Sequence, residues 1–201
     1  EKNGQWAEVA PFPGLNQENL QDCLEAILRG AFDAWPAVAW AMHVLSHPLD
    51  NHPQAPELAV NALLPGGSSK AVFKQTQDLY QEGYRCFKLK VGLRDRQEDL
   101  LLIHELLDAF PELSLRLDAN RSWSLKTALF WLAHLPECGI EYLEEPLKNP
   151  ADYSDLWAYQ ACPIGFDESL CEMRWDGLIP KAKALISVSY THLTLPTIYS
   201  V

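Results

Sequence analysis

The residues best suited to chemistry are charged side chains at the ends of four apolar runs. The runs read FKLKVG, LRLDAN, YLEEP and GFDES, and they contain Lys88, Lys90, Asp118, Glu144 and Asp167. From Lys90 to Asp167 the charged residues recur at intervals of 23 to 28 residues, about the length of one strand and one helix. Successive parallel strands point the same way, so these side chains are expected to meet at one end of a sheet.

Two lysines and three carboxylates in one place indicate a base beside a metal ion. Side chains alternate across a strand, so Lys88 and Lys90 share one face of FKLKVG. Buried lysines need anionic partners, and neighbouring carboxylates need a cation between them. A hard divalent ion such as Mg²⁺ takes oxygen ligands and leaves positions open for substrate. A nearby metal, a second lysine and partial burial would lower the pKa of a lysine amine, which makes it a usable general base.

Each of these residues also has an ordinary structural explanation. A single acidic residue at a strand end is most often a helix cap or a surface charge, and one Lys-x-Lys is weak evidence. His43 and His47 lie four residues apart and suggest a metal pair, but no third ligand is in register and His47 precedes a proline. The functional interpretation therefore rests on the common register of three acids and a lysine pair.

These charged residues require a scaffold of alternating strands and helices, and the sequence predicts one after residue 70. The expected strands span residues 86–91, 113–117, 140–143 and 164–166, and the expected helices span 71–82, 96–109, 125–135, 151–159 and about 175–181. Short connections between them favour βαβ units and a parallel sheet. Upstream, the expected elements are a strand at 5–9, helices at 17–29 and 36–45, and a strand at 58–64.

Composition restricts the class of protein. A chain of 201 residues that is 48% hydrophobic can bury a substantial core, and a net charge of −11 argues against nucleic acid and anionic membranes as partners. No apolar run approaches the ~20 residues that span a bilayer. Five scattered cysteines without a CxxC pair fit reduced thiols. We therefore expect a cytoplasmic enzyme that handles its anionic ligands locally.

Together the four motifs resemble those of the enolase superfamily, in its muconate-lactonising subgroup. The resemblance runs from residue 1 to about 186. It implies an α/β fold, with an N-terminal α+β capping domain followed by the first half of an enolase-type (β/α)8 TIM barrel. The incomplete capping domain would occupy residues 1–65 and the partial barrel residues 66–186. The segment WAEVAPFPGLNQENL resembles the capping-domain strand and the mobile loop that closes over substrate.

The resemblance also implies roles for individual residues. Lys90 would be the proton-transfer base and Lys88 its electrostatic neighbour, with Asn120 a supporting polar group beside the metal. The implied activity is that of a Mg²⁺-dependent carbon–oxygen lyase, which removes the proton alpha to the carboxylate of a small molecule and then a hydroxyl group. Two alternatives stay open: an N-acylamino-acid racemase or dipeptide epimerase of the same superfamily, and a catalytically inactive protein that binds the metal. The implied Mg²⁺ ligands are Asp118, Glu144 and Asp167.

The C-terminal segment departs from the family pattern. A second active-site lysine is expected about 22 residues after Asp167, where this chain has Ser189. Residues 187–201 show no clear strand–helix continuation and are interpreted as a non-native tail. We therefore expect the chain as written to have little or no turnover. Glu145 and Glu168, which adjoin proposed ligands, are expected to be supporting residues.

Overall fold

A computed structural model of the chain describes residues 6–14, 16–47, 60–64, 66–159, 162–171 and 182–185. The chain divides into two compact units, one of residues 1–57 with 187–201 and the other of residues 58–186. The strand predicted at 58–64 begins at Ala62 and belongs to the second unit. The interpretation of the first unit as a capping domain, and of residues 187–201 as a non-native tail, stays a prediction.

The described part of the first unit contains two helices, α1 (Leu20–Leu28) and α2 (Pro36–Ser46). Helix α1 begins three residues later than predicted, because Asn19 and Asp22 form a capping box in which each side chain accepts the other's backbone N–H at 3.0 Å. The strand predicted at 5–9 is wrong over residues 6–9, which pair with no other described segment.

The described part of the second unit is built on a parallel sheet in the order β1-β2-β3-β4-β5-β6. Every strand lies beside its neighbour in sequence, whereas a doubly wound sheet would reverse its order. This arrangement confirms the predicted fold class, part of a (β/α)8 barrel. The strands are β1 (Ala62–Leu64), β2 (Cys86–Lys90), β3 (Ser114–Asp118), β4 (Ile140–Glu144), β5 (Ile164–Phe166) and β6 (Ala182–Leu185), of which the sequence analysis missed β6.

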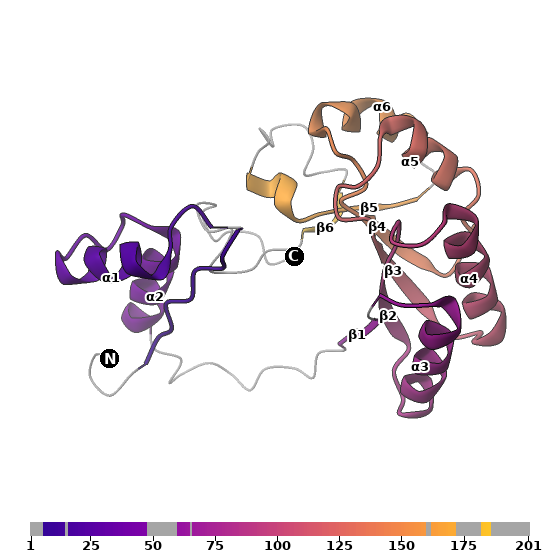
Figure 1. Ribbon diagram of the computed structural model, residues 1–201, viewed down its shortest axis with the longest axis horizontal. Helices are drawn as coiled ribbons and strands as arrows, with labels where there is room; N and C mark the ends of the chain where they lie inside the picture. The colour runs from indigo at the N-terminus through magenta and orange to yellow at the C-terminus, as the bar shows by residue number, and fades with distance from the viewer. Residues whose placement is uncertain are drawn as a thin grey trace. The chain divides into compact units, whose positions relative to one another are not determined.

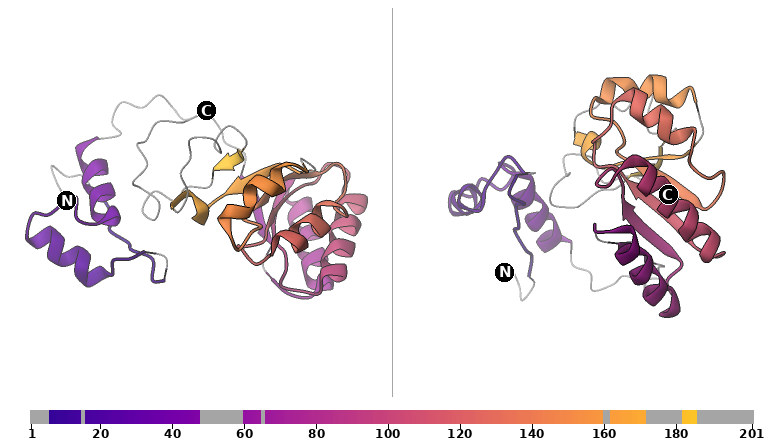
Figure 2. Two further views of the ribbon diagram at one scale, coloured as in Figure 1. Left: turned by 90° about the horizontal axis from the view of Figure 1, so that it is seen from above. Right: turned by 45° about the vertical axis from the view of Figure 1, so that its right-hand side comes forward.

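The helices of this unit line one side of the sheet (Figures 1 and 2). They are α3 (Ser69–Gln81), α4 (Arg96–Ala109), α5 (Leu125–Leu132) and α6 (Tyr153–Trp157), with 3₁₀ turns at Pro150–Asp152 and Glu168–Cys171. The bounds of α4 match the prediction. Helix α5 ends before residue 135 because Pro136 disfavours helical geometry in the residue before it. The helix predicted at 175–181 lies outside the described residues.

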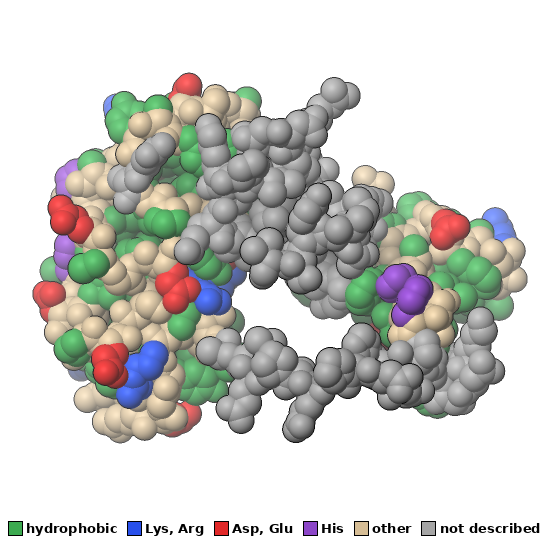
Figure 3. All heavy atoms as spheres, turned by 180° about the vertical axis from the view of Figure 1, so that it is seen from behind, with side chains coloured by type: hydrophobic (Ala, Val, Ile, Leu, Met, Phe, Trp, Pro, Cys, Tyr) green, Lys and Arg blue, Asp and Glu red, His purple; other side chains and the backbone are tan. Residues whose placement is uncertain are grey.

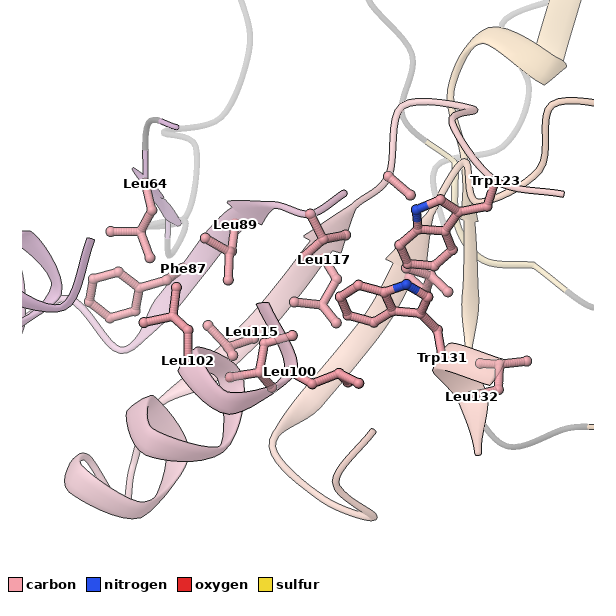
Figure 4. Close-up of a cluster of buried hydrophobic side chains, with 14 of the residues drawn as sticks. Leu64, Phe87, Leu89, Leu100, Leu102, Leu115, Leu117, Trp123, Trp131 and Leu132 are labelled. Carbon is pink, nitrogen blue, oxygen red and sulfur yellow. The ribbon is translucent and has the colours of Figure 1, made fainter. Parts of the chain in front are cut away.

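A hydrophobic core lies between the sheet and these helices (Figure 4). Phe87, Leu89, Leu115 and Leu117 are fully buried and come from alternate positions of β2 and β3. Burying a side chain of this size contributes about 1.5–3 kcal/mol. The intervening residues of the same strands must therefore face the other way, toward the barrel interior. No helix in the described part of the chain is long and apolar enough to cross a membrane.

Candidate active site

The two lysines of β2 lie on the face opposite its buried apolar residues, as the alternation predicts. Phe87 and Leu89 are 0% exposed, whereas the side chains of Lys88 and Lys90 are 22% and 41% exposed. Lys88 thus lies deeper and Lys90 lies nearer the rim, one alternate position closer to the end of the strand.

Strand register brings the candidate site residues to the same end of the sheet. Lys90 of β2 is the partner of Asp118 of β3, and Asp118 is the partner of Glu144 of β4. Glu144 in turn pairs with Gly165 of β5, so Asp167 follows two residues further along the chain. The regular spacing of the motifs therefore corresponds to neighbouring positions in space.

A network of ion pairs joins the lysines to two of the carboxylates. Lys88 Nζ lies 2.7 Å from Glu144 Oε1 and 3.2 Å from Asp118 Oδ2. Lys90 Nζ lies 3.4 Å from the same Asp118 oxygen. Burial lowers the pKa of the Lys88 amine, but its hydrogen bond to Glu144 and the charge of Asp118 outweigh burial and raise that pKa above its ordinary value. Lys88 is therefore a permanent cation, held in place between two acids.

The carboxylates at this edge are not fully neutralised by the lysines. Burial, with the nearby charge of Asp118, raises the pKa of Glu144 to about 7 although Lys88 opposes the shift. Burial and the neighbouring Glu168 raise the pKa of Asp167 to about 6. Acids whose ionised forms are this disfavoured near neutral pH indicate a place where an additional cation would be stabilised.

The donor chemistry of the site fits Mg²⁺. All three candidate ligands are carboxylates, and the buried Glu144 Oε2 accepts no hydrogen bond from the described part of the chain. Their arrangement is nevertheless not that of a closed metal site: among the described residues, no group of three or more His, Cys, Asp or Glu side chains is placed to hold an ion. Asp118 and Glu144 are instead bridged by Lys88, and the ligand roles of Asp118, Glu144 and Asp167 all stay predictions.

The loops that follow β3 and β4 hold three residues in left-handed backbone conformations. Asn120, Arg121 and Glu145 have φ values of 46°, 55° and 41°. The backbone N–H of Asn120 donates to Asp118 Oδ1 at 3.0 Å, so Asn120 supports this carboxylate through its main chain. The Arg121 N–H donates to the Glu145 carbonyl at 2.6 Å and joins the two loops. Such strained positions cluster where a fold must aim particular side chains.

Glu145 is a buried carboxylate that positions the chain after β5. Its Oε1 accepts the backbone N–H groups of Asp167 and Ser169, both at 2.8 Å. Its Oε2 accepts the Ser169 hydroxyl at 2.7 Å and the Tyr153 hydroxyl at 3.1 Å. Burial and the Glu145 charge raise the pKa of Tyr153, which keeps that phenol a donor. Glu145 thus makes supporting contacts, consistent with the role expected from its place beside Glu144.

Sequence reasoning missed a buried ion pair beside Lys90. Arg94 Nε lies 2.5 Å from Asp99 Oδ1, and the two side chains are 7% and 0% exposed. The available signal was the position of Asp99, which shares the buried face of α4 with Leu102, Ile103 and Leu106 at helical spacing. A charged residue at such a position needs a buried partner.

A second missed pair lies further down the inner face of the sheet. Arg116 Nε donates to Glu141 Oε2 at 2.7 Å, and Arg116 Nη1 donates to Asn61 Oδ1 at 3.0 Å. Glu141 also accepts the Ser114 hydroxyl at 2.8 Å. This network lies toward the N-terminal ends of the strands, away from the candidate site at their C-terminal ends, and satisfies its own charges, so it is structural.

The histidine pair of α2 is the other candidate from the sequence. His43 and His47 stack with ring centroids 4.2 Å apart and lie together on the exposed surface of the first unit (Figure 3). A ring nitrogen of His47 is hydrogen-bonded to the His43 carbonyl at 3.0 Å. No third ligand joins them in the described part of the chain.

Comparison with known proteins defines the class. Residues 71–177, more than half of the chain, match the family model described as enolase C-terminal domain-like. This chain belongs to the enolase superfamily. Among curated relatives, the o-succinylbenzoate synthase of Pectobacterium atrosepticum is 32% identical over 182 residues, covering 83% of this chain and 55% of the relative. That of Haemophilus influenzae is 30% identical over 185 residues, covering 83% and 56%. The chain spans about half the length of the curated relatives it matches.

Solved structures give the same fold. The o-succinylbenzoate synthase from Thermosynechococcus elongatus BP-1, complexed with Mg in its active site, aligns with a TM-score of 0.64 and 30% identity over 82% of this chain and 57% of that one. A dipeptide epimerase from Cytophaga hutchinsonii aligns with a TM-score of 0.60 over 82% of this chain and 54% of that one. Its identity is 21%, so this second likeness concerns the fold alone.

Proposed function

We propose that this chain carries the acid–base half of a Mg²⁺-dependent carbon–oxygen lyase, an o-succinylbenzoate synthase. The observation that carries the proposal is the placement of Lys90 against Asp118 at the ends of two paired strands, 3.4 Å apart, in a chain about one-third identical to curated synthases. The reaction would be the syn dehydration of 2-succinyl-6-hydroxy-2,4-cyclohexadiene-1-carboxylate to 2-succinylbenzoate, a step of menaquinone biosynthesis.

In this proposal Lys90 is the residue that moves the proton. Its side chain lies near the rim and is 41% exposed, and among the described residues its amine has one long contact, to Asp118, so a substrate can approach it. Lys90 Nζ takes the proton from the carbon that bears the carboxylate, and the electron pair left behind forms the new ring double bond as the hydroxyl group departs. The same proton, returned from Lys90 to that hydroxyl, makes the leaving group water, so the step balances with no further reactant.

Lys88 and the carboxylates would set the electrostatics around that transfer. Lys88 stays protonated against Glu144 and Asp118, so it adds positive charge beside Lys90 without competing for the substrate proton. Asp118, Glu144 and Asp167 would hold Mg²⁺, which when bound supplies positive charge to the substrate carboxylate as its alpha proton leaves.

The rest of the site would come from a complete barrel. The position expected for a second lysine is Ser189, which lies outside the described residues. We propose that the first unit forms the capping domain and the second the barrel segment, and that the 201-residue chain alone has little or no turnover. The boundary falls near residue 58 and not at the expected 65/66, because β1 pairs with β2 in the barrel sheet.

The test is to complete the barrel. The C-terminal remainder of the Pectobacterium atrosepticum synthase is fused after residue 186, and formation of 2-succinylbenzoate is followed by absorbance with and without Mg²⁺. We expect Mg²⁺-dependent product from the fusion and a loss of about 10²–10⁴-fold on Lys90→Ala, the contribution of a positioned acid–base group. Lys126→Ala, on an exposed residue of α5, is the matched control.

Three outcomes would contradict the proposal. A folded fusion that epimerises dipeptides but forms no 2-succinylbenzoate would favour the racemase or epimerase alternative. A folded fusion that binds Mg²⁺ and exchanges no alpha protons in deuterated water would favour a metal-binding protein without catalysis. Full activity in Lys90→Ala would remove Lys90 from the mechanism.

A further inference from the structure

The Arg94 side chain makes hydrogen bonds to three separate segments next to the main chain of the candidate base, Lys90. Its Nη2 donates to the carbonyl of Lys90 at 3.1 Å, at the end of β2. Its Nη1 donates to the carbonyl of Gly67 at 2.9 Å, in the turn between β1 and α3. Its Nε pairs with Asp99 in the first turns of α4. One guanidinium therefore fixes the positions of a strand end, a turn and the start of a helix at once.

Asp99 completes the arrangement from the other side. While Oδ1 receives Arg94, Oδ2 accepts the backbone N–H of Gly92 at 2.8 Å. Gly92 has φ +84°, and a Cβ there would lie 2.8 Å from the indole nitrogen of Trp123. Gly92, two residues after Lys90, is thus held between Asp99 and Trp123 with no room for a side chain.

We propose that Arg94 and Asp99 are positioning residues for Lys90, which rests on the proposed function in so far as Lys90 is the base. The pair holds the main chain of Lys90 from the helix side, while β3 holds it from the other side through the Val91 N–H, which donates to the Asp118 carbonyl at 2.9 Å. Loss of the pair frees the strand end and releases the Lys90 amine from its 3.4 Å contact with Asp118.

The opposite end of β2 supplies a natural control. Arg85 precedes the strand and pairs with Glu112 at 3.1 Å, but these side chains are 44% and 74% exposed. Exposed pairs contribute little to stability, and Arg85 lies at the end of the strand away from Lys90. A pair at each end of the same strand allows the effect of position to be separated from the effect of losing an ion pair.

The experiment measures the reactivity of individual lysines in the full chain. Reductive methylation with isotope-labelled formaldehyde, read by mass spectrometry, gives the labelling rate of Lys90 relative to exposed Lys126 in the same sample. The test variant is the double substitution Arg94→Met with Asp99→Asn, which removes both charges and keeps an acceptor for the Gly92 N–H. Replacing both partners avoids the unpaired buried charge that a single change would leave. The control variant is Arg85→Met with Glu112→Gln.

We expect Lys90 to be labelled about two- to fivefold faster in the Arg94/Asp99 variant, the change that corresponds to losing one partly exposed ion pair. Lys88, lower on the same strand, should keep its rate, and the control variant should leave both lysines unchanged. If Lys90 keeps its wild-type rate in the folded variant, or if Lys88 accelerates equally, the pair stabilises the sheet in general and the proposal is wrong.

If the double variant does not fold, the same labelling experiment is made with Arg94→Lys. Lysine keeps a charge for Asp99 but lacks the planar fork of donors by which the guanidinium reaches both carbonyls and Asp99, so the proposal requires faster labelling of Lys90 there too. The readout uses no turnover. A completed barrel that fails to dehydrate would overturn the proposed function, whereas an unchanged Lys90 rate would overturn only the positioning role.

Discussion

Glu145 offers the sharpest test of how the end of β5 is built. Glu145→Gln keeps the size of the side chain and an acceptor for the Asp167 and Ser169 N–H groups, but it removes the charge from four hydrogen bonds. Hydrogen bonds to a charged group contribute about 1.5–3 kcal/mol against about 1 kcal/mol for neutral ones. Because the amide can still donate to the two hydroxyls, we expect a loss of about 1–2 kcal/mol in the free energy of unfolding.

Glu145→Ala should cost more. It leaves the buried Ser169 N–H and the part-buried Asp167 N–H without an acceptor, at about 1–3 kcal/mol for each fully buried group, so the expected loss is about 2–5 kcal/mol. Urea unfolding followed by tryptophan fluorescence measures the free energy of unfolding of both variants. In thermal melts the expected fall in Tm for Glu145→Gln is roughly 2–8 °C. Glu98→Gln is the control, because Glu98 is exposed and accepts one hydrogen bond, from Ser69 at 2.7 Å.

The test is the order of the losses in the free energy of unfolding among the three variants. The reasoning is refuted if Glu145→Ala is no more destabilising than Glu98→Gln, because the four bonds would then contribute nothing net. It is also refuted if Glu145→Gln costs as much as Glu145→Ala, because the retained acceptor would then be irrelevant.

Three further predictions concern the ends of the strands. Because the pKa of Glu144 is raised to about 7 and that of Asp167 to about 6, Mg²⁺ must displace protons from these carboxylates when it binds. Its affinity, measured by calorimetric titration, should therefore rise up to about tenfold per pH unit per displaced proton between pH 5.5 and 7 and then level off. An affinity that does not change with pH would contradict the raised pKa values. Without metal, the free energy of unfolding should change with pH in the opposite direction. The folded state binds the Glu144 proton more tightly than the unfolded state, so the stability gained from that proton is lost as pH rises from about 4.5 through 7. In urea unfolding, Glu144→Gln should make this fall in stability smaller. Gly92→Ala should destabilise the fold by about 1–3 kcal/mol more than Gly83→Ala. Both glycines have positive φ, but only Gly92 lies against Trp123. Equal losses of stability in thermal melts would show that this close approach does not matter.

Sequence periodicity was sufficient to predict strands β2, β3 and β4 and the residues that meet at their ends. Alternation in FKLKVG separates Lys88 and Lys90 from the buried Phe87 and Leu89, and the structure shows that separation. The spacing from Lys90 to Asp118 and Glu144 corresponds to one strand–helix unit per step, and strand register makes these residues neighbours.

What the sequence could not supply were contacts that depend on side-chain reach. Nothing in the motif predicts that Lys88 bridges Glu144 and Asp118, because that depends on the twist and separation of three strands. Predicting the Arg94–Asp99 pair would require the conformation of the loop between β2 and α4. The start of α1 was misplaced because Asn19 caps the helix in preference to the earlier residues. Strand β6 was missed because its sequence, AKAL, consists mostly of alanine and lysine, which are uncommon in strands.

The central claim is that Asp118, Glu144 and Asp167 hold one divalent ion beside Lys90. Isothermal titration of the metal-free chain with MgCl₂ at pH 7.5 tests it directly, with Asp118→Asn, Glu144→Gln and Asp167→Asn compared against Asp155→Asn on the exposed face of α6. The claim predicts one ion per chain, an affinity at least about tenfold weaker in each of the three variants, as expected for the loss of a charged ligand, and no change in the control. Binding that persists in folded Asp167→Asn and Glu144→Gln, or no binding at all by the folded wild-type chain, would contradict it.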